Sequence, residues 1–448
     1  MAIQENSRET GKRKTLQERI AELEFQPEVY IYPTPRVYKP LDFQLNAADF
    51  GNELNIYVHI PFCRQICSFC GYLKIAGSDE NLKADYVNAV IKEINMYSRI
   101  LKGKTIKTLH FGGGTPSLLS VSQLARLIDA LVEANPRILE TCEEVSIEAT
   151  PESVEQGKFE NYKELGINRV SIGVQTLNNA EIALSRRHNL ADFSIRAIET
   201  LRKAGIPNIV ADLMIGIEHQ TPESFEASAR GLIQLMPETV ELYALGLMPQ
   251  TALGKQHHNL MGNKEIYLCY DIGRILFLEA GYKQDCHNRY AIPNRGSFLQ
   301  EDYVFHGMSL IGFGAGARSY AGNMHYRNAY NSTSPKTAVA EYMQMINGGG
   351  LSVESGIYLS DDEKMRQYAI GHIEALDKKE FEQRFGLSFG NAFPDLHSNL
   401  LRLGLAAEDK ERLVLTTKGL NFRDLICTEL FSKDVTAAEG TYRPRRNG

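Results

Sequence analysis

The stretch YVHIPFCRQICSFCGY, residues 57–72, contains three cysteines, Cys63, Cys67 and Cys70, directly after a strand-like run. Spacings of three and then two residues let one loop present three thiolates to a single inorganic cluster. A cubane iron–sulfur cluster has four irons, so three protein ligands leave one iron open to a small molecule. The stretch therefore predicts a 4Fe–4S cluster held by these cysteines.

A zinc site is the alternative interpretation of this cysteine cluster. Structural zinc normally takes four ligands from paired knuckles, and no second Cys/His knuckle follows at a suitable spacing. The chain has seven cysteines, an odd number, which fits a reducing compartment better than a disulfide framework. We expect the other four to be ordinary core or loop thiols: Cys142, Cys269, Cys286 and Cys427.

Composition narrows the class of protein. The chain has 448 residues, 43% of them hydrophobic and 23% charged, which predicts a globular protein of two or three domains. Its net charge of −6 argues against a nucleic-acid partner or an anionic membrane surface. No apolar run reaches the ~18 residues that span a bilayer, and the polar start lacks the apolar core of a signal peptide. We therefore expect a cytoplasmic protein.

Strand-like and helix-like segments alternate beyond the cysteine loop. Apolar residues alternate with polar ones over 54–60, and they recur every three or four residues over 82–101. Further strands are predicted at 108–111, 144–149, 169–174, 208–215 and 240–245, and further helices at 120–134, 153–165, 180–204 and 222–235. Such repetition is typical of a parallel sheet with outer helices. The pattern predicts an α/β fold built on a partial (β/α)6 barrel.

Polar or glycine residues interrupt the apolar runs near the carboxyl ends of these strands. The second strand runs into Gly112, Gly113, Gly114 and Thr115, where the absence of a Cβ lets a ligand approach the backbone. Glu148, Gln175 and Asp212 lie on or just after the third, fourth and fifth strands. A tight turn, or core polar groups bonded to backbone, are the simpler alternatives. Because the carboxyl ends of barrel strands meet at one rim, we expect one site there.

Several motifs together resemble those of the radical S-adenosylmethionine (SAM) superfamily, in its oxygen-independent coproporphyrinogen III oxidase-like branch. Besides the cysteine stretch they are FGGGTP at 111–116, SIEA at 146–149, RVSIGVQ at 169–175, DLMIG at 212–216 and QTPESF at 220–225. The resemblance covers residues 54–245 well. A weaker match continues through IGFGAGARS at 311–319.

The resemblance implies cofactors and a ligand set. SAM would chelate the open iron and be cleaved reductively to a 5′-deoxyadenosyl radical, with flavodoxin or ferredoxin as electron donor. Tyr57, Phe69, Gly113, Gly114, Thr115 and Glu148 would surround it. A second SAM would contact Gln175, Arg187, Asp212 and Ala244, and Arg318 aligns loosely with another contact. A surface position is the alternative for Arg187.

One departure from the oxidase pattern directs the functional prediction. The oxidase has a fourth cysteine two positions after the third, where this chain has Tyr72. By resemblance this favours the C-methyltransferases and cyclopropanases of the branch, so we expect a transferase that moves a methyl or methylene group to an sp² carbon. The alternatives are a coproporphyrinogen III oxidase-like enzyme, an anaerobic haem-degrading enzyme, and a non-enzymatic haem chaperone.

Other segments flank the predicted barrel. We expect an N-terminal arm over residues 1–50, the barrel over 51–260, a barrel extension with substrate loops over 261–355, and a winged-helix-like cap over 356–448. Thr15 and Glu18 form a capping-box pattern for a short helix in the arm. The arm would cross the barrel mouth or act as a peripheral strap. A polar loop at 285–303 is a candidate for substrate contacts, with His287 as a local hydrogen-bond partner.

Overall fold

The computed structural model describes residues 14–44, 46–77, 79–255, 260–331 and 333–440. Six parallel neighbours form the centre of its main sheet: β2 Glu53–Ile60, β5 Thr105–Gly113, β6 Glu144–Ala149, β7 Arg169–Gln175, β8 Asn208–Ile215 and β9 Thr239–Ala244. All six strands coincide with those predicted from the sequence. The α/β class and the partial barrel are therefore confirmed.

The outer helices connect these strands. They are α2 Glu80–Met96, α3 Ser98–Leu101, α4 Val121–Ala134, α5 Ile138–Thr141, α6 Gln156–Glu164, α7 Asn179–Leu184, α8 Ala191–Lys203 and α9 Pro222–Leu235. Local sequence fixes several starts: Ser120 caps α4 with Gln123 in a capping box, and Thr221 caps α9 before Pro222. The helix predicted over 180–204 is two helices, α7 and α8, and the segment between them carries Arg187.

Antiparallel strands extend the sheet on both sides of this centre. Beyond β2 lie β12 Ser309–Phe313, which is parallel to it, and then β13 Arg318–Tyr320, β14 Met324–Asn328, β15 Val353–Tyr358 and β1 Lys39–Pro40. Beyond β9 lie β11 Arg289–Ala291 and β10 Lys283–Cys286. Helices α10 Asn263–Glu279, α11 Leu299–Phe305 and α12 Pro335–Asn347 accompany them. The described sheet thus has thirteen strands.

The polar loop predicted at 285–303 is wrong. Lys283–Cys286 and Arg289–Ala291 pair as a hairpin on the edge of the sheet, and Leu299–Phe305 is a helix. The charged residues of this segment bind one another rather than a ligand. Arg289 is 2% exposed and forms ion pairs with Asp285, Glu301 and Asp302. His287 is a local partner as expected, with Nδ1 2.9 Å from Glu374 Oε1.

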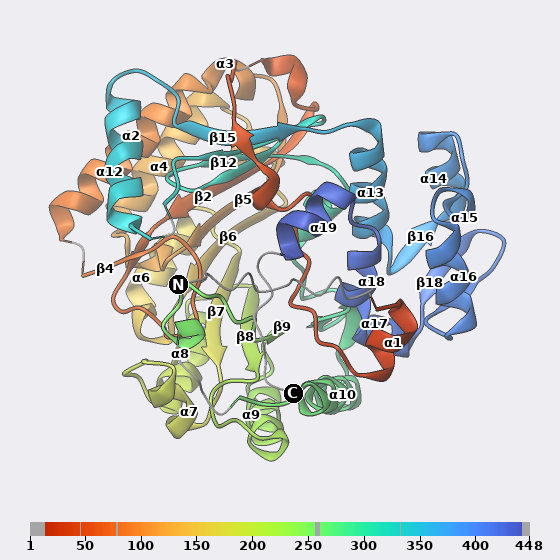
Figure 1. Ribbon diagram of the computed structural model, residues 1–448. Helices are drawn as coiled ribbons and strands as arrows, with labels where there is room; N and C mark the ends of the chain where they lie inside the picture. The colour runs from red at the N-terminus through yellow and green to blue at the C-terminus, as the bar shows by residue number, and fades with distance from the viewer. Residues whose placement is uncertain (1–13, 45, 78, 256–259, 332, 441–448) are drawn as a thin grey trace, which may run out of the picture.

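The C-terminal elements from α13 to α18 lie beside the barrel, and the last helix, α19, lies nearer the middle of the view (Figure 1). They are α13 Asp361–His372, β16 Ala375–Asp377, α14 Lys378–Phe385, α15 Phe389–Ala392, α16 Pro394–Arg402, β17 Ala406–Glu408, β18 Arg412–Leu415, α17 Thr417–Asn421, α18 Arg423–Glu429 and α19 Lys433–Gly440. Helices around a three-stranded antiparallel sheet make up this cap. The arm helix α1 Leu16–Ala21 shares its hydrophobic core.

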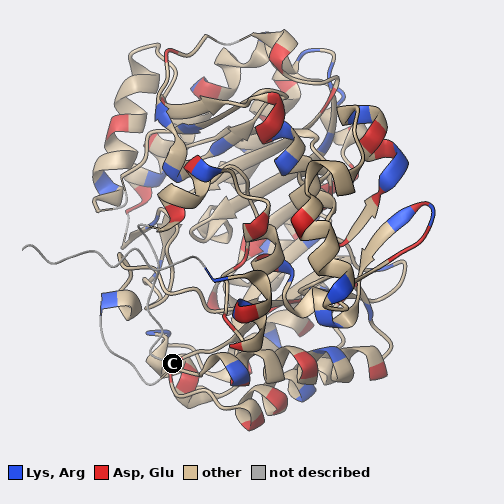
Figure 2. Ribbon diagram, turned by 45° about the vertical axis from the view of Figure 1, so that its right-hand side comes forward, with Lys and Arg blue, Asp and Glu red and all other residues tan. Residues whose placement is uncertain are grey.

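Basic and acidic residues are interspersed over the elements (Figure 2). Within the described residues, no helix has the length and apolar character needed to cross a bilayer.

Candidate active site

The three cysteines lie in one closed loop at the carboxyl end of β2. Two short parallel strands, β3 Phe62–Cys63 and β4 Ile75–Ala76, pair at its base. The amide of Ile75 donates to Pro61 O at 2.6 Å, and that of Gly77 donates to Cys63 O at 3.3 Å. The loop therefore holds all three thiols at one rim of the barrel.

The donor set fits an iron–sulfur cluster. Burial raises the pKa of the Cys63 thiol to about 12 and also raises that of Cys70, so these sulfurs become thiolates only when a metal replaces the proton. Thr115 Oγ1 lies 3.7 Å from Cys63 Sγ, a donor contact to a ligand sulfur. Within the described residues, no three His, Cys, Asp or Glu side chains, these cysteines included, already converge on one point, so the choice of a cluster over zinc rests on the three-thiol spacing.

The glycine run after β5 is required by close packing. Gly113 has φ +115°, and a Cβ there would lie 2.4 Å from the His59 ring. A Cβ on Gly112 would lie 2.7 Å from Glu148 Oε1, and one on Gly114 would lie 2.8 Å from Phe62 O. Side chains at these positions would push the end of β5 away from the cysteine loop. The run is therefore more than a tight turn.

Glu148 is fixed against this backbone. Its Oε2 accepts from the amide of Gly113 at 3.0 Å, and its Oε1 lies 3.2 Å from His110 Nε2. Burial would raise the pKa of Glu148, but the contacts with His110 and Gly113 outweigh it and hold that pKa below its usual value. The group is therefore an ionised acceptor, suited to a ligand hydroxyl or ammonium.

Two predicted aromatic residues flank the same region. Tyr57 stacks on His110 with ring centroids 5.7 Å apart, and its hydroxyl lies 2.9 Å from His59 Nδ1. Phe69 is partly buried against an apolar cluster that includes Met214 and Leu245 at the ends of β8 and β9. The cysteine loop thus packs onto the far strands of the barrel as well as onto β2.

Gln175 and Arg187 lie together at the end of β7. Gln175 has φ +68°, and its buried Oε1 has no hydrogen-bond partner in the described structure. Arg187 is only 6% exposed, so the surface alternative for it is wrong. Its Nη1 donates to Gly173 O at 2.6 Å and to Val174 O at 3.3 Å. An uncommon backbone conformation beside an unsatisfied amide is typical of a ligand site.

Asp212 lies further inside the barrel. Ser171 Oγ donates to it at 2.9 Å, while burial and then the nearby Glu241 carboxylate raise the pKa of Asp212 well above its ordinary value. A protonated, neutral carboxyl group at this position can donate a hydrogen bond as well as accept one. Ala244 ends β9 beside Ile215 of β8, and Arg318 lies on β13 of the sheet extension.

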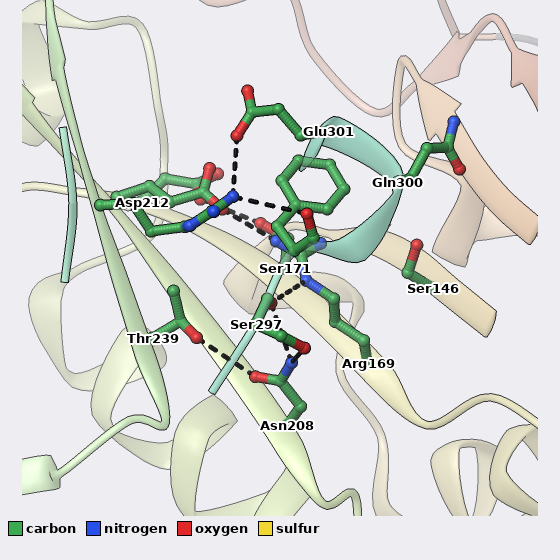
Figure 3. Close-up of polar contacts among 12 residues, drawn as sticks. Ser146, Arg169, Ser171, Asn208, Asp212, Thr239, Ser297, Gln300 and Glu301 are labelled. Carbon is green, nitrogen blue, oxygen red and sulfur yellow. Dashed lines mark hydrogen bonds and ion pairs between the residues drawn. The ribbon is translucent and has the colours of Figure 1, made fainter. Parts of the chain in front are cut away.

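The sequence did not predict a polar network among Arg169, Asn208 and Ser297 near Asp212 (Figure 3). Arg169 ion-pairs with Glu241 at 2.8 Å, donates to Ser297 O at 3.1 Å and stacks 3.8 Å from the Phe298 ring centroid. Asn208 Nδ2 also donates to Ser297 O at 3.0 Å. The available signal was a charged residue inside an apolar strand, as at Arg169 and Glu241.

Comparison with known proteins agrees with this geometry. The Radical SAM superfamily profile matches residues 57–232, and the HemN C-terminal domain profile matches residues 373–422. The chain is 31% identical over 264 residues to Heme chaperone HemW of Escherichia coli, covering 59% of this chain and 69% of that protein. It is 28% identical over 401 residues to oxygen-independent coproporphyrinogen III oxidase of Pseudomonas aeruginosa, covering 84% and 85%.

The solved structure of coproporphyrinogen III oxidase (HemN) from E. coli is similar over nearly the whole chain. Its TM-score is 0.79 at 26% identity, covering 92% of this chain and 98% of that one. The chain therefore belongs to the radical SAM superfamily, in the HemN-like family that contains coproporphyrinogen III oxidases and HemW chaperones. Membership implies a 4Fe–4S cluster and SAM as cofactors.

The predicted methyl or methylene transfer is wrong. The relatives found are coproporphyrinogen III oxidases and haem chaperones, so the transferase class and the methyltransferase and cyclopropanase character have no support. The prediction depended on Tyr72 in place of a fourth cysteine. One substitution in the loop does not outweigh similarity over the whole fold.

Proposed function

We propose that the chain is a radical SAM enzyme whose substrate is a tetrapyrrole, acting either as a coproporphyrinogen III oxidase or as an anaerobic haem-degrading enzyme. The supporting observation is similarity to HemN across both barrel and cap, together with three cysteines in one closed loop. When bound, the reduced cluster and SAM supply a 5′-deoxyadenosyl radical that abstracts hydrogen from substrate.

The residues of the barrel rim would position the cofactor. Cys63, Cys67 and Cys70 would hold the cluster, and the ionised Glu148 would accept hydrogen bonds from the ligand. Tyr57 and Phe69 would exclude water from the region between the cysteine loop and the strands. The positions of the side chains at the rim support these roles.

A second SAM is part of the proposal. Gln175 offers a buried Oε1 without a partner in the described structure, the neighbouring Arg187 supplies donors, and Asp212 supplies a carboxyl group that accepts from Ser171. Ala244 would line the same space. We also propose an external electron donor of the flavodoxin or ferredoxin type, because the cluster must be reduced for each cleavage.

Anaerobic turnover tests this function. The reconstituted protein is incubated with SAM, a reductant and either coproporphyrinogen III or haem, and 5′-deoxyadenosine is measured against tetrapyrrole consumed. We expect one of the two substrates to be consumed in proportion to 5′-deoxyadenosine. The variants Cys63→Ala, Cys67→Ala and Cys70→Ala should lose this product. The proposal would be contradicted if SAM were cleaved at the same rate with and without either tetrapyrrole and neither tetrapyrrole were consumed.

A haem chaperone is the second candidate, favoured by the 31% identity to Heme chaperone HemW. Such a protein would bind haem and release it intact. This candidate would be favoured if the reconstituted protein bound haem, left the macrocycle intact and formed no 5′-deoxyadenosine in proportion to haem.

A further inference from the structure

Two arginines face each other across the sheet extension. Arg318 of β13 is paired directly with Arg327 of β14, so both side chains lie on the same face. Like charges in direct cross-strand register destabilise a sheet. Within the described residues, the carboxylate in ion-pair range of either is Glu354, 3.7 Å from Arg327 Nη2 and half exposed. The pair therefore carries uncompensated positive charge.

Phenols, rather than carboxylates, surround Arg318. Its Nη1 donates to the hydroxyl of Tyr30 at 3.2 Å, and its guanidinium lies 5.7 Å from the centroid of that ring. Tyr38, also from the N-terminal arm, directly precedes β1, which pairs with Ser355 and Gly356 of β15 beside β14. The arm thus supplies two hydroxyl groups to the space beside the arginines.

Three buried polar atoms at this place have no hydrogen-bond partner in the described structure. They are Arg327 Nε, the hydroxyl oxygen of Tyr38 and Ser355 Oγ. Ser355 of β15 is in register with Arg327, which puts it in the same row as Arg318. Buried polar groups normally have a hydrogen-bond partner, so three neighbouring groups without one indicate that a ligand binds here.

The chemistry of these groups defines that ligand. A guanidinium only donates, and each hydroxyl can donate. Two guanidinium groups with two free hydroxyls match a carboxylate, whose two oxygens accept several charge-assisted hydrogen bonds. We propose that Arg318, Arg327, Tyr38 and Ser355 bind a carboxylate side chain of the substrate; this inference rests on the proposed tetrapyrrole chemistry.

The position fits a substrate site. Arg318 lies against Gly312 of β12, where a Cβ would come 2.2 Å from Arg318 O, and Gly312 is in register with Tyr57 of β2, near the strand end that leads into the cysteine loop. A carboxylate held there anchors the macrocycle at the edge of the barrel rim that the arm covers. The carboxylate of a SAM molecule is the other source of the same chemistry, and the test separates the two.

The test compares a porphyrin with its ester. Ferric protoporphyrin IX and its dimethyl ester are titrated into the reconstituted protein, and binding is followed by absorbance. We expect wild type to prefer the free acid at least tenfold, because charge-assisted bonds are lost with the ester. Arg318→Gln and Arg327→Gln should each weaken binding of the free acid about tenfold or more and leave binding of the ester unchanged. The exposed Arg137→Gln is the matched control.

Each result decides the proposal. Equal binding of acid and ester by wild type and variants overturns the carboxylate site while the proposed function stands. If Arg318→Gln instead weakens SAM in equilibrium dialysis and leaves porphyrin binding intact, the assignment to substrate is overturned. If wild type binds neither porphyrin, the haem-degrading form of the proposed function fails while the coproporphyrinogen form stands, and a thermal-shift measurement decides the site.

The thermal shift uses sodium propionate against sodium chloride at equal ionic strength. Propionate should raise the Tm of wild type above the chloride value, and Arg318→Gln should abolish the difference. Without added anion, Arg318→Gln should melt no lower than wild type, because it relieves the cross-strand repulsion. No propionate effect on wild type, or an equal propionate effect on wild type and Arg318→Gln, would overturn the site.

Discussion

Single residues at the rim of the barrel contact residues that are far from them in the sequence. Thr115 illustrates this, because its hydroxyl contacts the sulfur of Cys63 at 3.7 Å although the two residues are 52 positions apart. Hydrogen bonds to ligand sulfurs help to set the potential of an iron–sulfur cluster. Thr115 is therefore placed to tune a cluster held by Cys63.

Thr115→Val should lower the reduction potential of the cluster. A hydrogen bond of about 1 kcal/mol corresponds to ~40 mV for a one-electron couple. A redox titration followed by electron paramagnetic resonance measures the shift, and Thr115→Ser should restore the wild-type value. Equal potentials for the valine and serine variants would contradict this role of the hydroxyl.

Gly113→Ala should destabilise the fold by about 3 kcal/mol, from strain at φ +115° and a Cβ placed 2.4 Å from the His59 ring. Gly103→Ala is the control, since Gly103 has φ +77° but open space around its Cβ position. There we expect about 1 kcal/mol, from backbone strain alone. Thermal unfolding of both variants measures the difference, and equal losses would show that the contact with His59 costs nothing.

At the scale of the elements, the strands added to the barrel join it to the cap. Nε2 of His325, on β14, lies 3.2 Å from the side-chain amide of Gln367 on α13. His325 is 1% exposed and burial lowers its pKa to about 3, so the fold requires a neutral imidazole. In the unfolded chain the same group titrates near 6.5.

Acid should therefore weaken the junction between β14 and the cap. The contribution of His325 is complete above pH 6.5 and is lost as the pH falls towards 3, because the unfolded chain then binds a proton that the fold excludes. Between pH 6.5 and 5 the loss is about 2 kcal/mol. His325→Gln should show a smaller decrease in unfolding free energy over this range. Parallel curves for variant and wild type would contradict the prediction.

Across the whole molecule, the N-terminal arm and the C-terminal cap form one unit against the barrel. The amide of Val29 donates to Asp424 Oδ1 at 2.8 Å, and Arg423 Nη1 donates to Val29 O at 2.6 Å. Arg19 of α1 ion-pairs with Glu429 of α18 at 2.6 Å. Figure 1 shows α1 beside α17 and α18. The arm is thus anchored before it reaches the arginines of the sheet extension.

Arg423→Met should loosen the arm without unfolding the barrel. Arg423 is 3% exposed, and its loss leaves Val29 O without a donor and Asp424 without its cation. Hydrogen exchange at the amides of residues 28–32 should accelerate about tenfold or more, while the amides of β6 and β7 keep their protection. The exposed Arg412→Met is the control. Unchanged exchange in the arm would show that other contacts anchor it.

The central strands and the cysteine loop could be predicted because local patterns carry them. Apolar alternation over 54–60 and the spacing of Cys63, Cys67 and Cys70 depend only on neighbours in the chain. The sheet extension could not be predicted in this way. The local sequence predicts that Arg289 is a polar loop residue. In the structure it is buried, because its strand pairs with β9 and its side chain forms ion pairs with three carboxylates.

The sequence by itself determined the α/β barrel, the three-cysteine loop and the strand-end positions of Glu148, Gln175 and Asp212, because periodicity and short spacings encode them. Only the tertiary structure decided that Arg187 is buried and that Arg318 and Arg327 face each other beside two tyrosines of the arm. These juxtapositions arise from strand register and from contacts between residues hundreds of positions apart. No local pattern in the chain specifies them.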